Sequence, residues 1–206
     1  MANPPIKLIL CDLGNVLIDF DHRIAVRKIK KFSPRSTKEI YRLFFDSHLT
    51  KDFEEGRVTS LEFFRKMARK LALKNVSFAD FVVIWNDIFF ENEGMLDVLR
   101  RLKKKYRLHL ISNINELHYQ FIQKTFPKHL SVFDKIYCSH QVGRRKPDVL
   151  IYRRAMADAG VRPQNVLYTD DRKDLIQEAK KLGIRTLLFK NVKDFTNQLK
   201  KFDIFL

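Results

Sequence analysis

Short β-rich segments that alternate with amphipathic helical patterns constrain the possible fold more than any other feature of this sequence. The β-rich segments are Ile6–Cys11, Arg107–Ser112, Lys135–Ser139, Asn165–Thr169 and Ile184–Phe189. Helical patterns separate the last four of these segments and close the chain, at Asn115–Thr125, Asp148–Ala159, Asp171–Leu182 and Asp194–Lys201. Strands that alternate with helices form a mostly parallel sheet covered on both faces. The sequence therefore predicts a doubly wound α/β fold.

The connection between the first two β-rich segments is too long for this alternation of strands and helices. A strand–helix–strand unit needs about 30 residues, yet residues 12–106 separate the first two β-rich segments. Gly94–Lys105 can serve as the crossover helix, so residues 20–92 are predicted to be an insertion. That insertion carries four amphipathic helical patterns, at Arg23–Lys31, Ser36–Ser47, Thr59–Leu73 and Ala79–Phe89. We therefore expect an α/β core of residues 1–19 and 93–206, with a helical-bundle cap of residues 20–92 above the carboxyl ends of the strands.

Composition leaves the partner of this chain open. Hydrophobic residues make up 45% of the 206 residues, which is enough for a sizeable core, and no apolar run approaches the about 20 residues of a membrane span. We expect a cytoplasmic protein, because the N-terminus has no signal-peptide pattern and Cys11 and Cys138 lie in apolar runs as free thiols would. The net charge of +16 fits a solvated basic surface, a nucleic-acid surface or a field that attracts small anions.

Polar side chains stand where four of the predicted strands end. They are Asp12 after the first strand, Ser112 and Asn113 at the second, Lys146 after the third, and Asp170 and Asp171 after the fourth. Each of them alone is better explained as a helix cap, a loop stabiliser or a solvated side chain. In a parallel sheet, however, all of these positions lie at one edge. We therefore expect them to share one crevice.

The types of these residues indicate phosphoryl chemistry. Carboxylates gathered at one point repel each other, and an all-oxygen ligand set that relieves this repulsion favours Mg²⁺. A lysine and a serine hydroxyl add a positive charge and a donor for phosphate oxygens. One carboxylate could then attack phosphorus and form an aspartyl-phosphate, which water would hydrolyse.

Four segments at these residues resemble the motifs of the haloacid dehalogenase (HAD) superfamily. They are residues 8–17 (LILCDLGNVL), 111–113 (ISN), 145–148 (RKPD) and 167–171 (LYTDD). Their order, their spacing and the helical insertion after the first motif are similar to members with a small helical cap. The Asp-Leu-Gly-Asn-Val form of the first motif and the segment Phe53–Gly56 also resemble the α-D-glucose-1-phosphate phosphatase branch.

The resemblance implies a metal site and a nucleophile. Asp12 would be the nucleophile and a metal ligand, the backbone carbonyl of Gly14 a second ligand, and Asp171 with Asp170 would complete the protein's share of the Mg²⁺ ligands.

The resemblance also implies a phosphate site. Ser112 and the backbone amide of Asn113 would hold the transferring phosphoryl group, and Lys146 would neutralise it and hold the nucleophile in place. The expected substrate is a small phosphorylated metabolite, with a sugar phosphate such as glucose 1-phosphate favoured, and the expected state is a monomer or weak dimer.

Two departures from the superfamily pattern matter. Most phosphatases of the superfamily have an acid–base Asp two positions after the nucleophile, where this chain has Gly14. A general acid contributes about 10²–10⁴-fold, so the sequence predicts a preference for weakly basic leaving groups unless Asp19 or Asp21 supplies the proton. In the fourth motif, Leu175 stands where an Asn or Asp is usual, and Asp174 is one position early as a substitute.

The sequence leaves two other functions open. Within the superfamily, Asp12 could attack carbon as in a haloacid dehalogenase, although the adjacent Asp170 and Asp171 make more sense around a cation. In a different class of function, a catalytically weak member could bind nucleic acid or an acidic partner through its basic surface. No recognised nucleic-acid motif supports this, so nucleic acid is the less favoured partner, and no membrane partner is expected.

Overall fold

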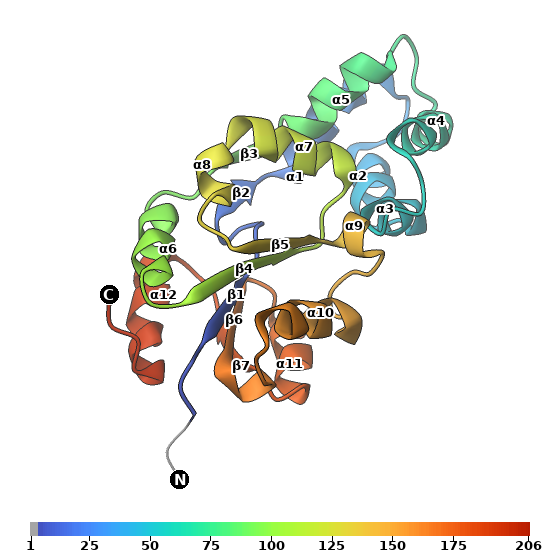
Figure 1. The fold of residues 1–206 in the computed structure, drawn as a ribbon. Helices are drawn as coiled ribbons and strands as arrows, with labels where there is room; N and C mark the ends of the chain where they lie inside the picture. The colour runs from blue at the N-terminus through green and yellow to red at the C-terminus, as the bar shows by residue number, and fades with distance from the viewer. Residues whose placement is uncertain (1–3) are drawn as a thin grey trace.

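A five-stranded parallel sheet forms the centre of the molecule (Figure 1). The computed structural model describes residues 4–206. The strand order is β5-β4-β1-β6-β7, and the strands are β1 (Leu8–Cys11), β4 (Arg107–Ser112), β5 (Lys135–Cys138), β6 (Val166–Asp170) and β7 (Arg185–Leu188). The predicted α/β fold is confirmed, with every neighbouring pair in this sheet parallel.

Side chains of β1 alternate between two apolar cores, one on each face of the sheet. Ile9 and Cys11 belong to one core, and Leu8 and Leu10 to the other. The first face is covered by α6 (Met95–Lys103), α7 (Glu116–Thr125), α8 (Pro127–Leu130) and α12 (Val192–Leu199). The second face is covered by α10 (Val149–Ala159) and α11 (Lys173–Lys181). This burial on both faces explains why all four residues of β1 are apolar.

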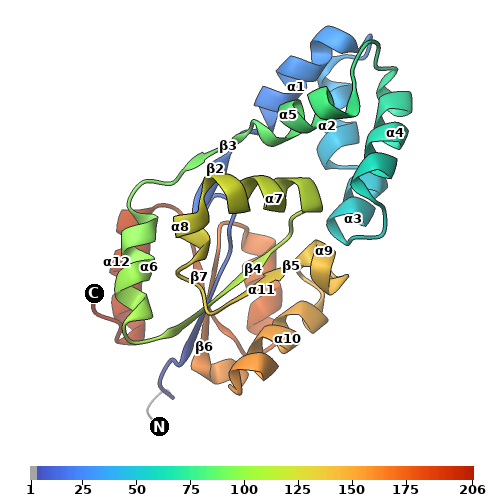
Figure 2. The same ribbon diagram turned by 45° about the horizontal axis from the view of Figure 1, so that its top comes forward.

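Five helices lie together outside the sheet (Figure 2), and their buried side chains form a third apolar cluster. They are α1 (His22–Ile29), α2 (Thr37–Phe45), α3 (His48–Glu54), α4 (Ser60–Leu71) and α5 (Phe78–Asn86). An antiparallel pair, β2 (Ile18–Phe20) and β3 (Phe89–Glu91), connects these helices to the sheet. We call this group of helices the cap. Its cluster includes Leu117 of α7, so α7 packs against both the sheet and the cap.

Capping residues set where the cap helices begin. Both predicted capping boxes form, with Ser36 bonded to Glu39 and Thr59 to Glu62, and a third joins Ser77 to Asp80. In each box the side chain of the cap residue accepts from a backbone N–H of the first turn, while the acidic side chain accepts from the cap residue.

The shortest elements were missed by the sequence patterns. The β2–β3 pair, α3, α8 and α9 (Ser139–Val142) were not predicted, and Phe89 lies in β3 rather than in the helix predicted for Ala79–Phe89. These elements have three to seven residues, which is at most about two helical turns, so their apolar spacing carries little signal. Helix α11 begins at Lys173 rather than at Asp171, because Asp170 accepts a hydrogen bond from the Arg172 amide just before the first turn.

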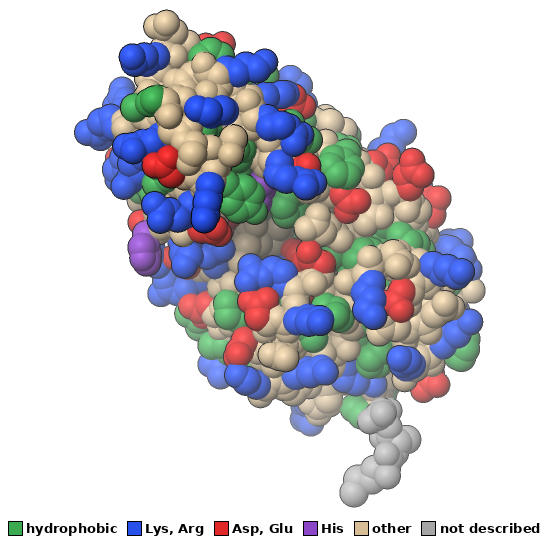
Figure 3. Space-filling model, turned by 180° about the vertical axis from the view of Figure 1, so that it is seen from behind, with side chains coloured by type: hydrophobic (Ala, Val, Ile, Leu, Met, Phe, Trp, Pro, Cys, Tyr) green, Lys and Arg blue, Asp and Glu red, His purple; other side chains and the backbone are tan. Residues whose placement is uncertain are grey.

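Basic side chains do not gather in one stripe on the face shown in Figure 3. Lysine and arginine side chains lie over both lobes of that face and are interspersed with acidic ones. Several of them form exposed ion pairs, such as Arg100 with Asp97 and Lys181 with Glu178. No helix within residues 4–206 is long and apolar enough to cross a membrane. Cys11 and Cys138 are both buried and free.

Candidate active site

The carboxyl ends of the central strands bring the predicted site residues to one cavity. Asp12 directly follows β1 and extends its pairing, because its amide donates to the Thr169 carbonyl oxygen at 3.0 Å. The cavity, of about 230 Å³, is lined by six of the seven predicted residues, namely Asp12, Gly14, Ser112, Asn113, Lys146 and Asp171. The seventh, Asp170, is the last residue of β6 and is completely buried.

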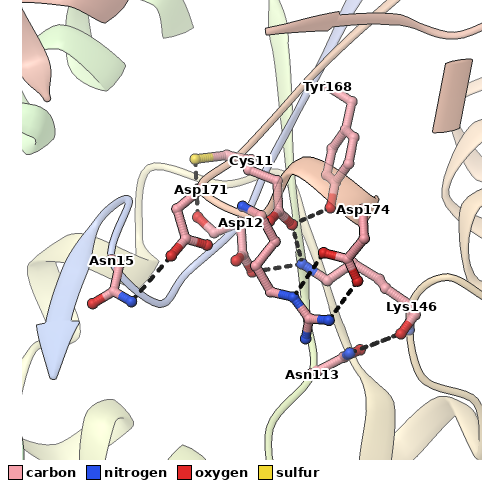
Figure 4. A network of polar contacts seen from close by, with 10 residues as sticks. Cys11, Asp12, Asn15, Asn113, Lys146, Tyr168, Asp171 and Asp174 are labelled. Carbon is pink, nitrogen blue, oxygen red and sulfur yellow. Dashed lines mark hydrogen bonds and ion pairs between the residues drawn. The ribbon is translucent and has the colours of Figure 1, made fainter. Parts of the chain in front are cut away.

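Lys146 joins two of the carboxylates at the floor of this cavity (Figure 4). Its Nζ atom donates to Asp12 Oδ1 at 2.7 Å and to Asp170 Oδ2 at 2.8 Å. All three side chains are at most 10% exposed. A buried charge without a partner costs about 3–5 kcal/mol. Each of the three ions is therefore stabilised by the opposite charge beside it. The arrangement is a fixed cation held against the predicted nucleophile.

The pKa values of these groups reflect burial opposed by ion pairing. Burial raises the pKa of Asp12, and the Lys146 ammonium works against that rise. For Lys146, burial alone would lower the pKa, but Asp12 and Asp170 raise it above its usual value. Burial also acts to raise the pKa of Asp170, yet Lys146 brings it below its usual value. Lys146 is therefore charged at neutral pH, and its charge favours the ionised form of both carboxylates.

Three carboxylates at this point fit a divalent cation. Asp12, Asp170 and Asp171 each offer one oxygen, and these atoms lie within 4.8 Å of one another. Asp170 Oδ2 also accepts from the Tyr168 hydroxyl, and its Oδ1 accepts from the Arg172 amide. Lys146 compensates only part of the negative charge. An oxygen-only cluster with excess negative charge suits Mg²⁺, which binds through one or two carboxylates and keeps several waters.

Asn15 supports this cluster and was missed by the sequence patterns. Its Nδ2 atom donates to Asp171 Oδ2 at 3.1 Å (Figure 4). Asn15 has φ 53°, a left-handed conformation that Asn tolerates better than most residues. The bond orients the carboxylate, which is the support expected of groups that surround metal ligands. Asp174, the weaker expectation, instead pairs with Arg172 at 2.6 Å, while Leu175 lines the cavity.

Asn113 holds the backbone of Lys146 with its side chain. Its Nδ2 donates to the Lys146 carbonyl oxygen at 2.9 Å, and its Oδ1 accepts from the Lys146 amide at 2.7 Å. This pair of bonds ties the loop that carries Lys146 to the end of β4. The sequence interpretation assigned Asn113 to the phosphate through its backbone amide, and the role of the side chain was not foreseen.

Aromatic rings form the wall of the cavity on the cap side. Trp85 stacks on His118 with ring centroids 4.9 Å apart, and Phe45 stacks on His22 at 3.6 Å. Burial lowers the pKa of His22 to about 4 and that of His118 to about 3, so both rings are neutral near pH 7. The aromatic and histidine rings that line the cavity are Phe20, His22, Phe45, Trp85, Phe89 and His118.

The aromatic and histidine side chains of residues 20–85 occupy different positions relative to the cavity. Phe44 is fully buried in the cap, and His48 is exposed. Phe20, His22, Phe45 and Trp85 line the cavity. Asp19 and Asp21, the two carboxylates considered as proton donors, lie elsewhere. Asp19 accepts from Asn92, and Asp21 pairs with Arg23 on the surface.

Comparison with known proteins gives relatives that match along most of this chain. A D-ribitol-5-phosphate phosphatase of Bacteroides thetaiotaomicron is 28% identical over 201 residues, which are 94% of this chain and 97% of that protein. A solved structure of a HAD family enzyme from the same organism, in complex with magnesium and inorganic phosphate, has a TM-score of 0.83 at 30% identity and covers 94% of this chain and 98% of that one. A structure described as a predicted HAD-like family hydrolase from Porphyromonas gingivalis has a TM-score of 0.83 at 26% identity, over 96% and 98% of the two chains.

The four motifs, the parallel sheet with its helical cap and the acidic cluster beside Lys146 agree with one family. Residues 15–189 of the chain match the haloacid dehalogenase-like hydrolase family. The chain therefore belongs to the haloacid dehalogenase-like hydrolases.

Proposed function

We propose that this chain is a magnesium-dependent phosphatase that hydrolyses a small phosphomonoester through an aspartyl-phosphate on Asp12. The observation that carries this proposal is the contact of Lys146 with Asp12 and Asp170 on the floor of a cavity that Asp171 also lines. A buried cation beside a carboxylate favours its ionised form and fixes its direction, as a nucleophile needs.

Each site residue has a role in this scheme. Asp12 attacks phosphorus, and Lys146 holds Asp12 in place and offers positive charge to the phosphoryl oxygens. Ser112, at the end of β4, and the backbone amide of Asn113 donate to the same oxygens. Asp12, Asp170, Asp171 and the Gly14 carbonyl would hold Mg²⁺, which would supply positive charge beside the transferring phosphoryl group. Water then hydrolyses the aspartyl-phosphate and restores Asp12.

The cavity favours a small substrate. Its volume of about 230 Å³ is below the range of about 300–1,000 Å³ for ligand pockets in general. We propose residues 20–92 as the cap that closes over the substrate, since aromatic rings from this segment form one wall of the cavity. Glucose 1-phosphate is the candidate from the form of the first motif, and D-ribitol 5-phosphate is the candidate from the relative of Bacteroides thetaiotaomicron.

Phosphate release tests the proposal. Purified protein is assayed against sugar phosphates, sugar-alcohol phosphates, nucleotides and aryl phosphates, with Mg²⁺ and with EDTA. We expect release that requires Mg²⁺ and that Asp12→Asn abolishes. Asp97→Asn is the matched control, because Asp97 is an exposed residue of α6. No release from any ester in the presence of Mg²⁺ would contradict the proposal.

Halide release and nucleic-acid retention, measured beside phosphate release, distinguish the two other functions. A haloacid dehalogenase would release halide from 2-haloacids, in an Asp12-dependent reaction without phosphate turnover. A nucleic-acid-binding member would retain DNA or RNA in a salt-sensitive way and release no phosphate. We favour the phosphatase because three carboxylates around one point suit a cation, which neither alternative needs.

A further inference from the structure

The cavity contains a carboxylate that the scheme above does not use. Glu54 is the last residue of α3, and it lines the same cavity as Asp12 and Asp171. Its side chain is 20% exposed. Among residues 4–206, these are the three carboxylates that line the cavity, so Glu54 is the one left without a role in metal binding or nucleophilic attack.

Contacts with the sheet domain fix the position of Glu54. Its carbonyl oxygen accepts from Ser139 Oγ at 2.5 Å, and its Oε2 atom lies 2.6 Å from Arg145 Nε. Two residues later, Gly56 has φ +70°, and a Cβ there would lie 2.3 Å from the His140 carbonyl oxygen. This close approach of two backbones requires glycine. The end of α3 is thus docked against the segment that leads to Lys146.

The usual place for an acid–base group is filled in this protein. A Cβ built on Gly14 would lie 2.7 Å from Cε1 of Phe20. A carboxylate two residues after Asp12 would therefore collide with the Phe20 ring. The other titratable rings in the cavity, His22 and His118, are neutral near pH 7 for the reason given above and are poor proton donors there.

We propose that Glu54 is the proton donor for the leaving group, an inference that rests on the phosphatase function proposed above. In the first step, the Asp12 oxygen forms a bond to phosphorus while the bond from phosphorus to the leaving-group oxygen breaks. The Glu54 carboxyl gives its proton to that oxygen, and an alcohol departs. In the second step, the Glu54 carboxylate takes a proton from water as the water oxygen attacks phosphorus. The aspartyl-phosphate bond breaks, phosphate leaves, and Asp12 and protonated Glu54 are restored.

The surroundings of Glu54 shift the pKa of its carboxyl upward. Burial raises the pKa of Glu54, and the charge of Glu55 adds to the rise, whereas Arg145 and Arg172 act to lower it; the net direction is upward. Raised carboxyl pKa values suit general acids that work near neutral pH. The ion pair with Arg145 also stabilises the negative charge that Glu54 carries after it has transferred its proton.

Leaving-group dependence distinguishes this role from a structural one. The substrates are aryl phosphates with leaving groups from 4-nitrophenol to phenol, together with D-ribitol 5-phosphate, whose leaving group is a strongly basic alkoxide. We expect kcat/KM of the wild type to depend little on leaving-group pKa, which replaces the expectation drawn from Gly14 alone. Glu54→Gln should lower kcat/KM by about 10²–10⁴-fold on D-ribitol 5-phosphate and leave 4-nitrophenyl phosphate nearly unchanged. The alkaline limb of the wild-type pH profile should disappear in the variant.

Glu55→Gln changes the neighbouring carboxylate, which pairs with Arg57 and does not line the cavity, and it should leave the leaving-group dependence as in the wild type. An equal loss on all substrates would show that Glu54 only positions the cap, and no loss would show that it has no part in catalysis. If Glu54→Gln does not fold, a steep dependence in the wild type itself overturns the proposal. A wild type that hydrolyses no phosphomonoester overturns the phosphatase function as well, so the two failures are distinguishable.

Discussion

His118 should make the stability of this protein fall as the pH falls below neutral. His118 belongs to α7, and its ring is buried against the cap. Its Nε2 lies 3.0 Å from the Trp85 carbonyl oxygen, and its Nδ1 lies 3.0 Å from Asn115 Nδ2. The carbonyl accepts, and the Asn115 amide nitrogen donates, because Asn115 Oδ1 already accepts from the His118 backbone amide. The ring therefore carries a single proton, on Nε2. A second proton on Nδ1 would face a donor in a buried site.

The size of the effect follows from the two pKa values. Burial lowers the pKa of His118 to about 3 in the folded protein, whereas an unfolded chain has a histidine pKa of about 6.5. Below pH 6.5 the unfolded state binds a proton that the folded state does not bind, so the free energy of unfolding decreases as the pH falls toward 3. Between pH 7 and pH 5 this linkage amounts to about 2 kcal/mol.

Urea unfolding at pH 7 and pH 5 measures this quantity. We expect the decrease in unfolding free energy over this interval to be smaller by about 2 kcal/mol in His118→Gln than in the wild type. The pKa of His22 is also lowered by burial and acts in the same direction, but His22 is present in both proteins and cancels in the comparison. His48→Gln is the control, because His48 is exposed. An equal decrease in the wild type and His118→Gln would refute the reasoning.

Three further predictions concern the cap, the Lys146 loop and the metal. Gly56→Ala should lower the unfolding free energy by at least about 2 kcal/mol, because its Cβ would clash with the His140 carbonyl and its φ is positive. Gly143→Ala is the control, with φ +75° and no atom within 4 Å, and it should cost about 1 kcal/mol. Similar losses of the two variants in urea unfolding would contradict the close contact. Asn113→Ala removes both side-chain hydrogen bonds to the Lys146 backbone. Because each bond is worth about 1 kcal/mol, kcat/KM in the phosphate-release assay should fall about tenfold. An unchanged kcat/KM would show that the loop needs no such support. Mg²⁺ at 100 times its Kd should raise the unfolding free energy by about 2.7 kcal/mol in thermal melts, with EDTA reversing the gain, and no shift would argue against binding at the acidic cluster.

The sequence determined the fold class and brought the residues of the proposed site to one edge of the sheet. Alternating strands and helices admit few sheet topologies. Polar residues at the strand ends, such as Asp12, Lys146 and Asp170, must then meet at one edge, because parallel strands all end on the same side. These conclusions depend on periodicity and chain direction, which are local properties of the sequence. The capping boxes were predictable for the same reason, since both partners lie within one turn.

Only the tertiary structure decided which further side chains line the cavity. Glu54 reaches the cavity because α3 docks on Ser139 and Arg145, and Phe20 fills the space beside Gly14 because β2 folds back across it. Contacts of this kind join residues far apart in the chain, and they arise from packing of the cap on the sheet. No local pattern encodes them, because the same short segment can turn its side chain toward different neighbours in different packings.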